Sequence, residues 1–178
     1  MTALPPGPGE GGGPSAAAIR AERPGDAAAI GEVTRAAFSE VPYASGTEAA
    51  IVAALREAGA LTLSLVAEEA GRVVGHVAVS PVEGIGPGWF GLGPVSVRPG
   101  RQKAGIGARL VRAALERLRA AGASGCVVLG DPGYYGRFGF AARPGVGFEG
   151  APPEYFQQIR FAGPAPEGRV RYHPAFGG

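Results

Sequence analysis

The segment spanning residues 89–129 constrains the fold more than any other part of the chain. A helix is predicted over residues 104–121, because apolar residues recur there at helical spacing on one face. That stripe consists of Ile106, Leu110, Val111, Ala114, Leu115 and Leu118. Apolar strand candidates precede the helix at residues 89–97 and follow it at residues 126–129. Strand, helix and strand in this order predict a β-α-β crossover between two parallel strands.

The remaining elements predict a mixed α/β (α+β) domain around this crossover. Helices are expected from Pro24 and from Ser45, the second ending at Gly59. Strands are expected at residues 18–21, 61–65, 72–79, 156–161 and 169–172, with the second and third forming an antiparallel hairpin. Residues 1–17 are rich in Gly and Pro and have little to bury, so we expect a disordered tail followed by one domain over residues 18–178.

Composition narrows the setting of the protein. No apolar run reaches the roughly 20 residues that a membrane helix needs. No basic region followed by an apolar region marks a signal peptide, so we expect a cytoplasmic protein that does not act at a membrane. Cys126 is the one cysteine, and its apolar surroundings predict a buried core residue.

Basic residues are concentrated around the central helix. Residues 98–119 contain seven of them against the single acid Glu116: Arg98, Arg101, Lys103, Arg109, Arg112, Arg117 and Arg119. Such a local excess predicts a local anionic ligand. The patch is small and lacks interleaved aromatic residues, so we do not expect nucleic-acid binding. For Arg112, Arg117 and Arg119 a solvated helix face is the favoured interpretation.

The turn before the helix reads Arg101-Gln102-Lys103-Ala104-Gly105-Ile106-Gly107. It is not a P-loop, since the chain has no Gly-Lys pair, and Leu110 stands where a dinucleotide fingerprint needs its third glycine. Glycines before a helix still let the backbone approach a ligand closely. The exposed N–H groups and the helix dipole then favour an anion such as phosphate.

Two motifs resemble one known family. Gln102-x-x-Gly105-x-Gly107, after a strand ending in Val-x-Pro, is similar to the acetyl-CoA-binding signature of the GNAT superfamily of N-acetyltransferases. Independently, Tyr135-x-x-x-Gly139-Phe140 resembles that family's segment after the fifth strand. With residues 92–95 and 128–131, the chain looks like a bacterial branch of predicted acetyltransferases.

The resemblance implies a fold and a donor site. The fold would be a mixed central sheet, flanked by helices and splayed between its fourth and fifth strands, with acetyl-CoA in the gap. The implied binding residues are Val95, Ser96 and Val97 for the pantetheine arm, and Arg101, Gln102, Lys103, Ala104, Gly105, Ile106, Gly107 and Ala108 around the diphosphate, with Tyr135 near the sulfur. Arg101 and Lys103, with Arg109 as a further candidate, would neutralise the diphosphate.

The resemblance also implies direct acetyl transfer without an acyl-enzyme, so Cys126 needs no nucleophilic role. Tyr135 would protonate the leaving thiolate, since the phenol pKa of about 10 lies near that of a thiol. Its alternative role is to pack against the sulfur or hydrogen-bond it, and Tyr134 is the second candidate for the acid. We expect no metal.

The general base is less clear from the sequence. The family often uses a Glu near the fourth strand, but residues 92–97 carry no carboxylate. Asp131 is a candidate, although Asp before Pro132 is also a common cap or turn residue. His76 has a suitable pKa but, as a lone mid-strand His, is more simply a structural residue. Glu40 and Glu48 could recognise a cationic amine, but solvated faces are the favoured interpretation.

The leading hypothesis is therefore an N-acetyltransferase that acts on a small-molecule amine. A protein lysine or N-terminus is the alternative acceptor, and this would need an open groove. A CoA-binding regulatory module without turnover is the hypothesis from another class. A homodimer is a further expectation from families of this kind.

Overall fold

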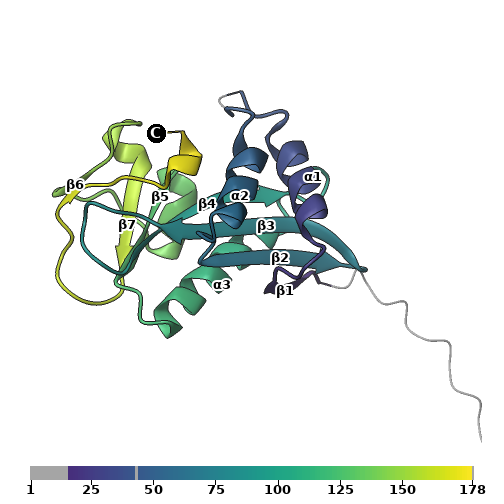
Figure 1. Cartoon of the computed structure of the whole chain (residues 1–178), viewed down its shortest axis with the longest axis horizontal. Coiled ribbons are helices and arrows are strands. Elements are labelled where there is room, and N and C mark those ends of the chain that lie inside the picture. The colour runs from purple at the N-terminus through teal and green to yellow at the C-terminus, as the bar shows by residue number, and fades with distance from the viewer. Residues whose placement is uncertain (1–15, 43, 178) are drawn as a thin grey trace, which may run out of the picture.

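The computed structural model describes residues 16–42 and 44–177. A six-stranded sheet lies at its centre, in the order β1-β2-β3-β4-β5-β7, with helices on both faces (Figure 1). The strands are β1 (Ala18–Ala21), β2 (Leu63–Glu69), β3 (Arg72–Pro81), β4 (Trp89–Val97), β5 (Gly125–Leu129) and β7 (Phe156–Arg160). The helices are α1 (Ala27–Phe38), α2 (Glu48–Glu57), α3 (Ile106–Ala120) and the short α4 (Pro132–Tyr135). Neighbouring strands are antiparallel except β4 and β5, so the mixed sheet and its crossover are confirmed.

Side chains alternate between the two faces of β2 and β3, and this alternation builds two cores. Leu65, Val77 and Val79 are buried together with the apolar stripe of α3. Val66 and Ala78 are buried on the opposite face, among residues of α1 and α2. The helix pair and α3 therefore enclose the sheet from opposite sides.

The close fit of α3 on the sheet depends on Gly75 in β3. A Cβ atom at this position would lie 3.0 Å from Cδ1 of Leu110 and 3.1 Å from Cγ2 of Ile106. Because Gly75 lacks that atom, the first turns of α3 pack directly on β3. This contact places the N-terminus of α3 beside the end of β4.

The strands β4 and β5 pair for only part of their length. Their parallel register runs from Trp89 opposite Gly125 to Leu92 opposite Val128. Beyond Leu92 the register of β4 against β3 shifts by one residue, and β4 continues to Val97 with β3 as its one strand partner among the described residues. The splay between the fourth and fifth strands is therefore confirmed.

The C-terminal segment differs from the sequence prediction. The strand expected at residues 156–161 is β7, but the one expected at residues 169–172 is wrong in extent. The structure has only the two-residue β8 (Gly168–Arg169), paired with β6 (Val146–Gly147) in a separate sheet. The segment then changes partner, because Arg171 exchanges backbone hydrogen bonds with Glu83. Because the segment pairs first with β6 and then with Glu83, its residues do not show the regular alternation of a single strand.

The N-terminal tail predicted over residues 1–17 lies mostly outside the described residues, which begin at residue 16. Ala17 is already buried in the core on the α3 side of the sheet. Within residues 16–42 and 44–177, no helix has the length and apolar character needed to cross a membrane.

Candidate functional site

The turn between β4 and α3 has a backbone that only a few residue types adopt easily. Gly100, Lys103 and Gly105 have left-handed φ angles of 88°, 65° and 80°. Gly105 comes directly before Ile106, the first residue of α3, so the helix predicted from residue 104 begins two residues later. Among the described residues, no side chain caps this helix. The N–H groups of its first turn are therefore available to an anion.

Gly107 marks the point where the turn meets α4. A Cβ atom there would lie 3.0 Å from Oη of Tyr134 and 3.5 Å from Cγ2 of Val97. The end of β4, the first turn of α3 and α4 therefore converge on one glycine. The sequence motif predicted an open backbone here, and the structure adds Tyr134 as its neighbour.

The cations of the turn divide into anchored and free groups. The guanidinium of Arg101 lies 2.5 Å from Oε1 of Glu69 at the end of β2, and Arg98 donates to the carbonyl of Val73 at 3.5 Å. Lys103 and Arg109 are exposed and form no ion pair with any described residue. In this structure the Arg101 side chain ties the turn to the β2–β3 hairpin, and its expected contact with the ligand stays a prediction.

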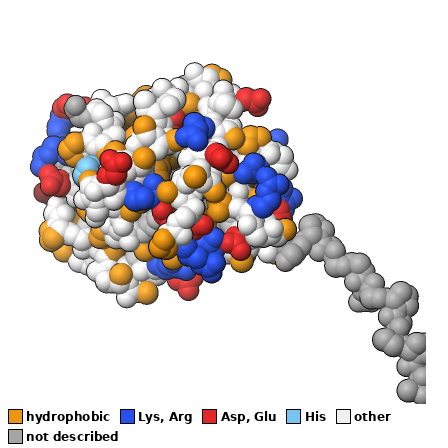
Figure 2. All heavy atoms as spheres, turned by 45° about the vertical axis from the view of Figure 1, so that its right-hand side comes forward, with side chains coloured by type: hydrophobic (Ala, Val, Ile, Leu, Met, Phe, Trp, Pro, Cys, Tyr) orange, Lys and Arg blue, Asp and Glu red, His pale blue; other side chains and the backbone are white. Residues whose placement is uncertain are grey.

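The side chain of Gln102 also serves the turn, since its Nε2 donates to the carbonyl of Val97 at 3.1 Å. The backbone N–H of this residue was the predicted ligand contact, and the side-chain bond leaves it available. On the face that Figure 2 shows, several basic side chains lie beside acidic ones.

The second half of β4 forms one wall of the gap between β4 and β5. Val95, Ser96 and Val97 pair with β3, and their other edge has no strand partner among the described residues. Ser96 is buried, and its Oγ donates to Oγ1 of Thr34 in α1 at 3.4 Å. This edge offers backbone groups for an extended ligand to pair with, as a further strand would.

Tyr135 lies at the other wall, where β5 ends. Its ring packs so closely over Gly130 that a Cβ atom there would overlap it, and it meets Phe140 edge-on at 5.9 Å. Burial, with smaller contributions from Tyr134 and Cys126, raises the pKa of Tyr135 well above its usual value. The phenol therefore stays protonated at neutral pH and can donate a hydrogen bond.

Asp131 follows β5 and caps α4. Its Oδ1 accepts a hydrogen bond from the N–H of Gly133 at 3.1 Å, and the residue is exposed. The cap that sequence reasoning gave as one explanation is thus present. Oδ2 makes no hydrogen bond to any described residue, so the carboxylate keeps an oxygen free to accept a proton.

Two other titratable groups, His76 and Cys126, are buried in the protein. His76 is fully buried, and its Nε2 lies 2.8 Å from Oγ of Ser64, which donates in turn to Glu22. Burial lowers the pKa of His76 to about 4, so it is neutral at pH 7. Since Ser64 donates to Glu22, the proton of the imidazole belongs on Nε2. Burial also raises the pKa of the Cys126 thiol, in agreement with its predicted core role.

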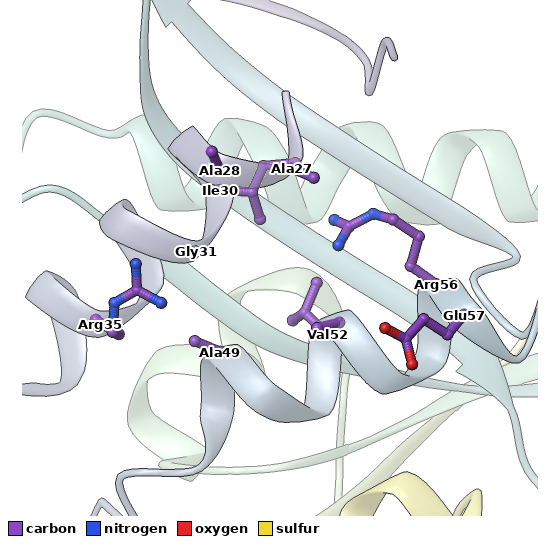
Figure 3. A pocket seen from close by; sticks show the side chains of 10 residues that line it. Ala27, Ala28, Ile30, Gly31, Arg35, Ala49, Val52, Arg56 and Glu57 are labelled. Atoms are coloured by element: carbon purple, nitrogen blue, oxygen red, sulfur yellow. The ribbon is translucent and has the colours of Figure 1, made fainter. Parts of the chain in front are cut away.

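Two features of the structure gave no signal in the sequence. The ring of Tyr172 packs on Gly91 in β4, 2.7 Å from where a Cβ would lie, one residue before the strands part. The segment containing it continues to η3 (Pro174–Phe176), which packs on α2. A pocket of about 390 Å³ also lies between α1 and α2, with Arg35 toward one end and Arg56 and Glu57 toward the other (Figure 3). All its lining residues belong to these two helices, so it is separate from the turn and the gap.

Comparison with known proteins gives a consistent result. Residues 30–140 match the model of the family described as "Acetyltransferase (GNAT) family". YhbS, an uncharacterised N-acetyltransferase of Escherichia coli strain K12, is 42% identical over 125 residues, which cover 68% of this chain and 72% of that protein.

Two crystal structures agree with this match over most of the chain. A GNAT family acetyltransferase from Brucella melitensis, in complex with acetyl-CoA, is 56% identical, with a TM-score of 0.80 over 90% of this chain and 97% of that one. The structure of YhbS from Escherichia coli in complex with CoA has 36% identity and a TM-score of 0.82, covering 90% and 92% of the two chains.

Proposed function

The chain belongs to the acetyltransferase (GNAT) family of N-acetyltransferases, and from that membership we propose that it transfers an acetyl group from acetyl-CoA directly to the amine of a small molecule. One observation carries the donor assignment. The sheet opens beyond Leu92 and Val128, at the end where the glycine turn and the uncapped α3 lie. The related Brucella melitensis and Escherichia coli structures hold acetyl-CoA and CoA, respectively.

In the proposed complex the unpaired edge of Val95–Val97 pairs with the pantetheine arm. The backbone N–H groups from Gln102 to Ala108 bind the diphosphate, and the helix dipole adds to the attraction. Lys103 and Arg109 neutralise its charge. Arg101 contributes indirectly by fixing the turn to Glu69. Gly107 leaves room for the ligand because it has no side chain.

The proposed transfer begins when the neutral amine attacks the acetyl carbonyl carbon. The C–S bond then breaks, the amine loses a proton and the sulfur takes one up. Tyr135 donates a hydrogen bond to the departing sulfur and, because burial raises its pKa, keeps its own proton. The thiolate then takes up its proton from solvent. Asp131 is the proposed acceptor of the amine proton, through its free oxygen. Neither step calls for a metal.

A small acceptor is favoured by the C-terminal segment. Tyr172 covers β4 at Gly91, and η3 packs on α2, so the face of the sheet opposite α3 is enclosed beside the gap. A protein lysine or N-terminus would need an open groove there. We also propose a cytoplasmic location, which the single buried Cys126 is consistent with. The suggested homodimer stays a prediction.

Release of free CoA thiol tests this function. Purified protein with acetyl-CoA is offered a panel of small amines and, separately, lysine-containing peptides and intact proteins. We expect thiol release with one or more small amines and little above the hydrolysis rate with the peptides. Tyr135→Phe should lower kcat by 10-fold or more, in the range of a lost acid or oxyanion donor. A kcat of Tyr135→Phe equal to that of the wild type would show that Tyr135 takes no part in the chemistry. Release of CoA thiol with proteins or peptides alone would contradict a small-molecule acceptor.

A further inference from the structure

A second basic surface lies beside the turn, in the groove between α3 and η1 (Gly136–Phe138). A pocket of about 390 Å³ opens there, lined by Arg112, Leu115, Glu116, Arg119, Arg137 and Phe138. The three arginines are exposed and form no ion pair with any residue in the described ranges. With Glu116 as the one acid in its lining, the pocket is positively charged and suited to an anion.

Aromatic rings hold two of these arginines in place. The guanidinium of Arg112 lies 5.2 Å from the ring centroid of Phe138, and that of Arg137 lies 4.6 Å from the ring centroid of Tyr134. The two rings pack edge to face at 5.4 Å. A guanidinium that stacks on a ring keeps its N–H edge free, and that edge matches the oxygens of a phosphate.

Contacts of Tyr134 connect the groove to the turn before α3. Oη of Tyr134 lies against Gly107 in the first turn of α3, and the ring of Tyr134 carries Arg137. Arg112 is five residues beyond Gly107, about 7.5 Å further along the helix. A ligand whose diphosphate lies on the turn can therefore extend its nucleotide end toward Arg112 and Arg137.

We propose that Arg112 and Arg137 bind the 3′-phosphate of CoA, an inference that rests on the proposed function. CoA carries this phosphate monoester one ribose ring away from its diphosphate, whereas ATP and NAD lack it. The two arginines would thus select CoA among ADP-containing molecules. Arg119 stacks on Phe161 at 4.7 Å, and Glu116 lies between it and Arg112 along the helix, so the phosphate belongs at the Arg112–Arg137 end.

Calorimetric titration with CoA and with 3′-dephospho-CoA tests the proposal on the full chain. Wild-type protein should bind CoA about 10-fold or more tightly than dephospho-CoA, as expected for hydrogen bonds between charged groups. The Arg112→Gln/Arg137→Gln double variant should bind both compounds equally, with the Kd that the wild type has for dephospho-CoA. Arg117→Gln, on the same helix but outside this pocket, is the matched control and should keep the wild-type preference.

The outcomes separate this proposal from the donor assignment. Unchanged affinity for dephospho-CoA in the double variant shows that its fold and diphosphate site are intact. If that variant still prefers CoA, or if the wild type has no preference, the arginine assignment is wrong while the donor assignment stands. If the wild type binds neither compound, both are overturned. Should the double variant fail to fold, single Arg112→Gln and Arg137→Gln proteins must each lose part of the preference.

Discussion

At the scale of single residues, the site depends as much on glycines, which have no side chain, as on the residues whose side chains line it. Gly105 adopts a left-handed φ angle that turns the backbone into α3. Because Gly107 has no Cβ atom, its backbone can lie close to the hydroxyl of Tyr134. Both glycines were predictable from sequence, because they stand with one residue between them at the start of the helix. The role of Arg101 was not, because its partner Glu69 is 32 residues away in the sequence.

Gly107→Ala should weaken CoA binding by about 10-fold, because the added methyl fills the approach to the backbone N–H groups. The fold should change little, since the nearest atom, 3.0 Å away, is the mobile end of the Tyr134 side chain. Calorimetric Kd values for CoA and thermal melting measure the two effects. Gly147→Ala is the control, since a Cβ at Gly147 meets nothing within 4 Å. Equal CoA affinity in the two variants would remove Gly107 from the donor site.

At the scale of elements, α4 joins the two walls of the gap and was missed in the sequence, because a helix of one turn has no periodicity to detect. Its cap, Asp131, was noticed only through the Pro that follows. The β4–α3–β5 crossover was predictable because its apolar stripe is long and regular. The C-terminal segment was not, since its pairing depends on distant residues such as Glu83.

Two variants of Asp131 separate capping from proton transfer. Asp131→Asn keeps a good cap and should change the free energy of unfolding by only a few tenths of a kcal/mol, whereas Asp131→Ala should lower it by about 1 kcal/mol. If Asp131 is the base, both variants lose about 100-fold in kcat/KM. Denaturant titration and steady-state kinetics measure these changes. Full activity in Asp131→Asn would assign the residue to the cap alone.

At the scale of the whole molecule, the buried side chain of His76 in the sheet makes the stability of the fold depend on pH. His76 has a pKa of about 4 in the folded chain, against about 6.5 when exposed. The unfolded chain therefore binds a proton below pH 6.5 that the folded chain accepts only near pH 4. Stability should fall by up to about 3 kcal/mol as the pH drops through this window. Burial acts to raise the pKa of Glu22, but its hydrogen bonds with Arg56 and Ser64 together lower it below the usual value. Protonation of this carboxylate therefore adds to the loss of stability at lower pH.

Urea unfolding between pH 7 and pH 4 checks this linkage. His76→Gln should unfold more easily at pH 7 but show a flatter dependence on pH than the wild type. His173→Asn is the control, because the other histidine caps Ala175 through Nδ1 and Asn can replace that acceptor. A His76→Gln slope equal to that of the wild type would show that another group controls the pH dependence.

The central claim is that the gap between β4 and β5, with the turn before α3, holds acetyl-CoA. A crystal structure of this chain grown with acetyl-CoA tests it most directly. We predict the diphosphate on the N–H groups of residues 102–108, the pantetheine along Val95–Val97, and the thioester sulfur within hydrogen-bond distance of Oη of Tyr135. Electron density for the ligand elsewhere, for instance between α1 and α2, with the gap filled by side chains, would contradict the account.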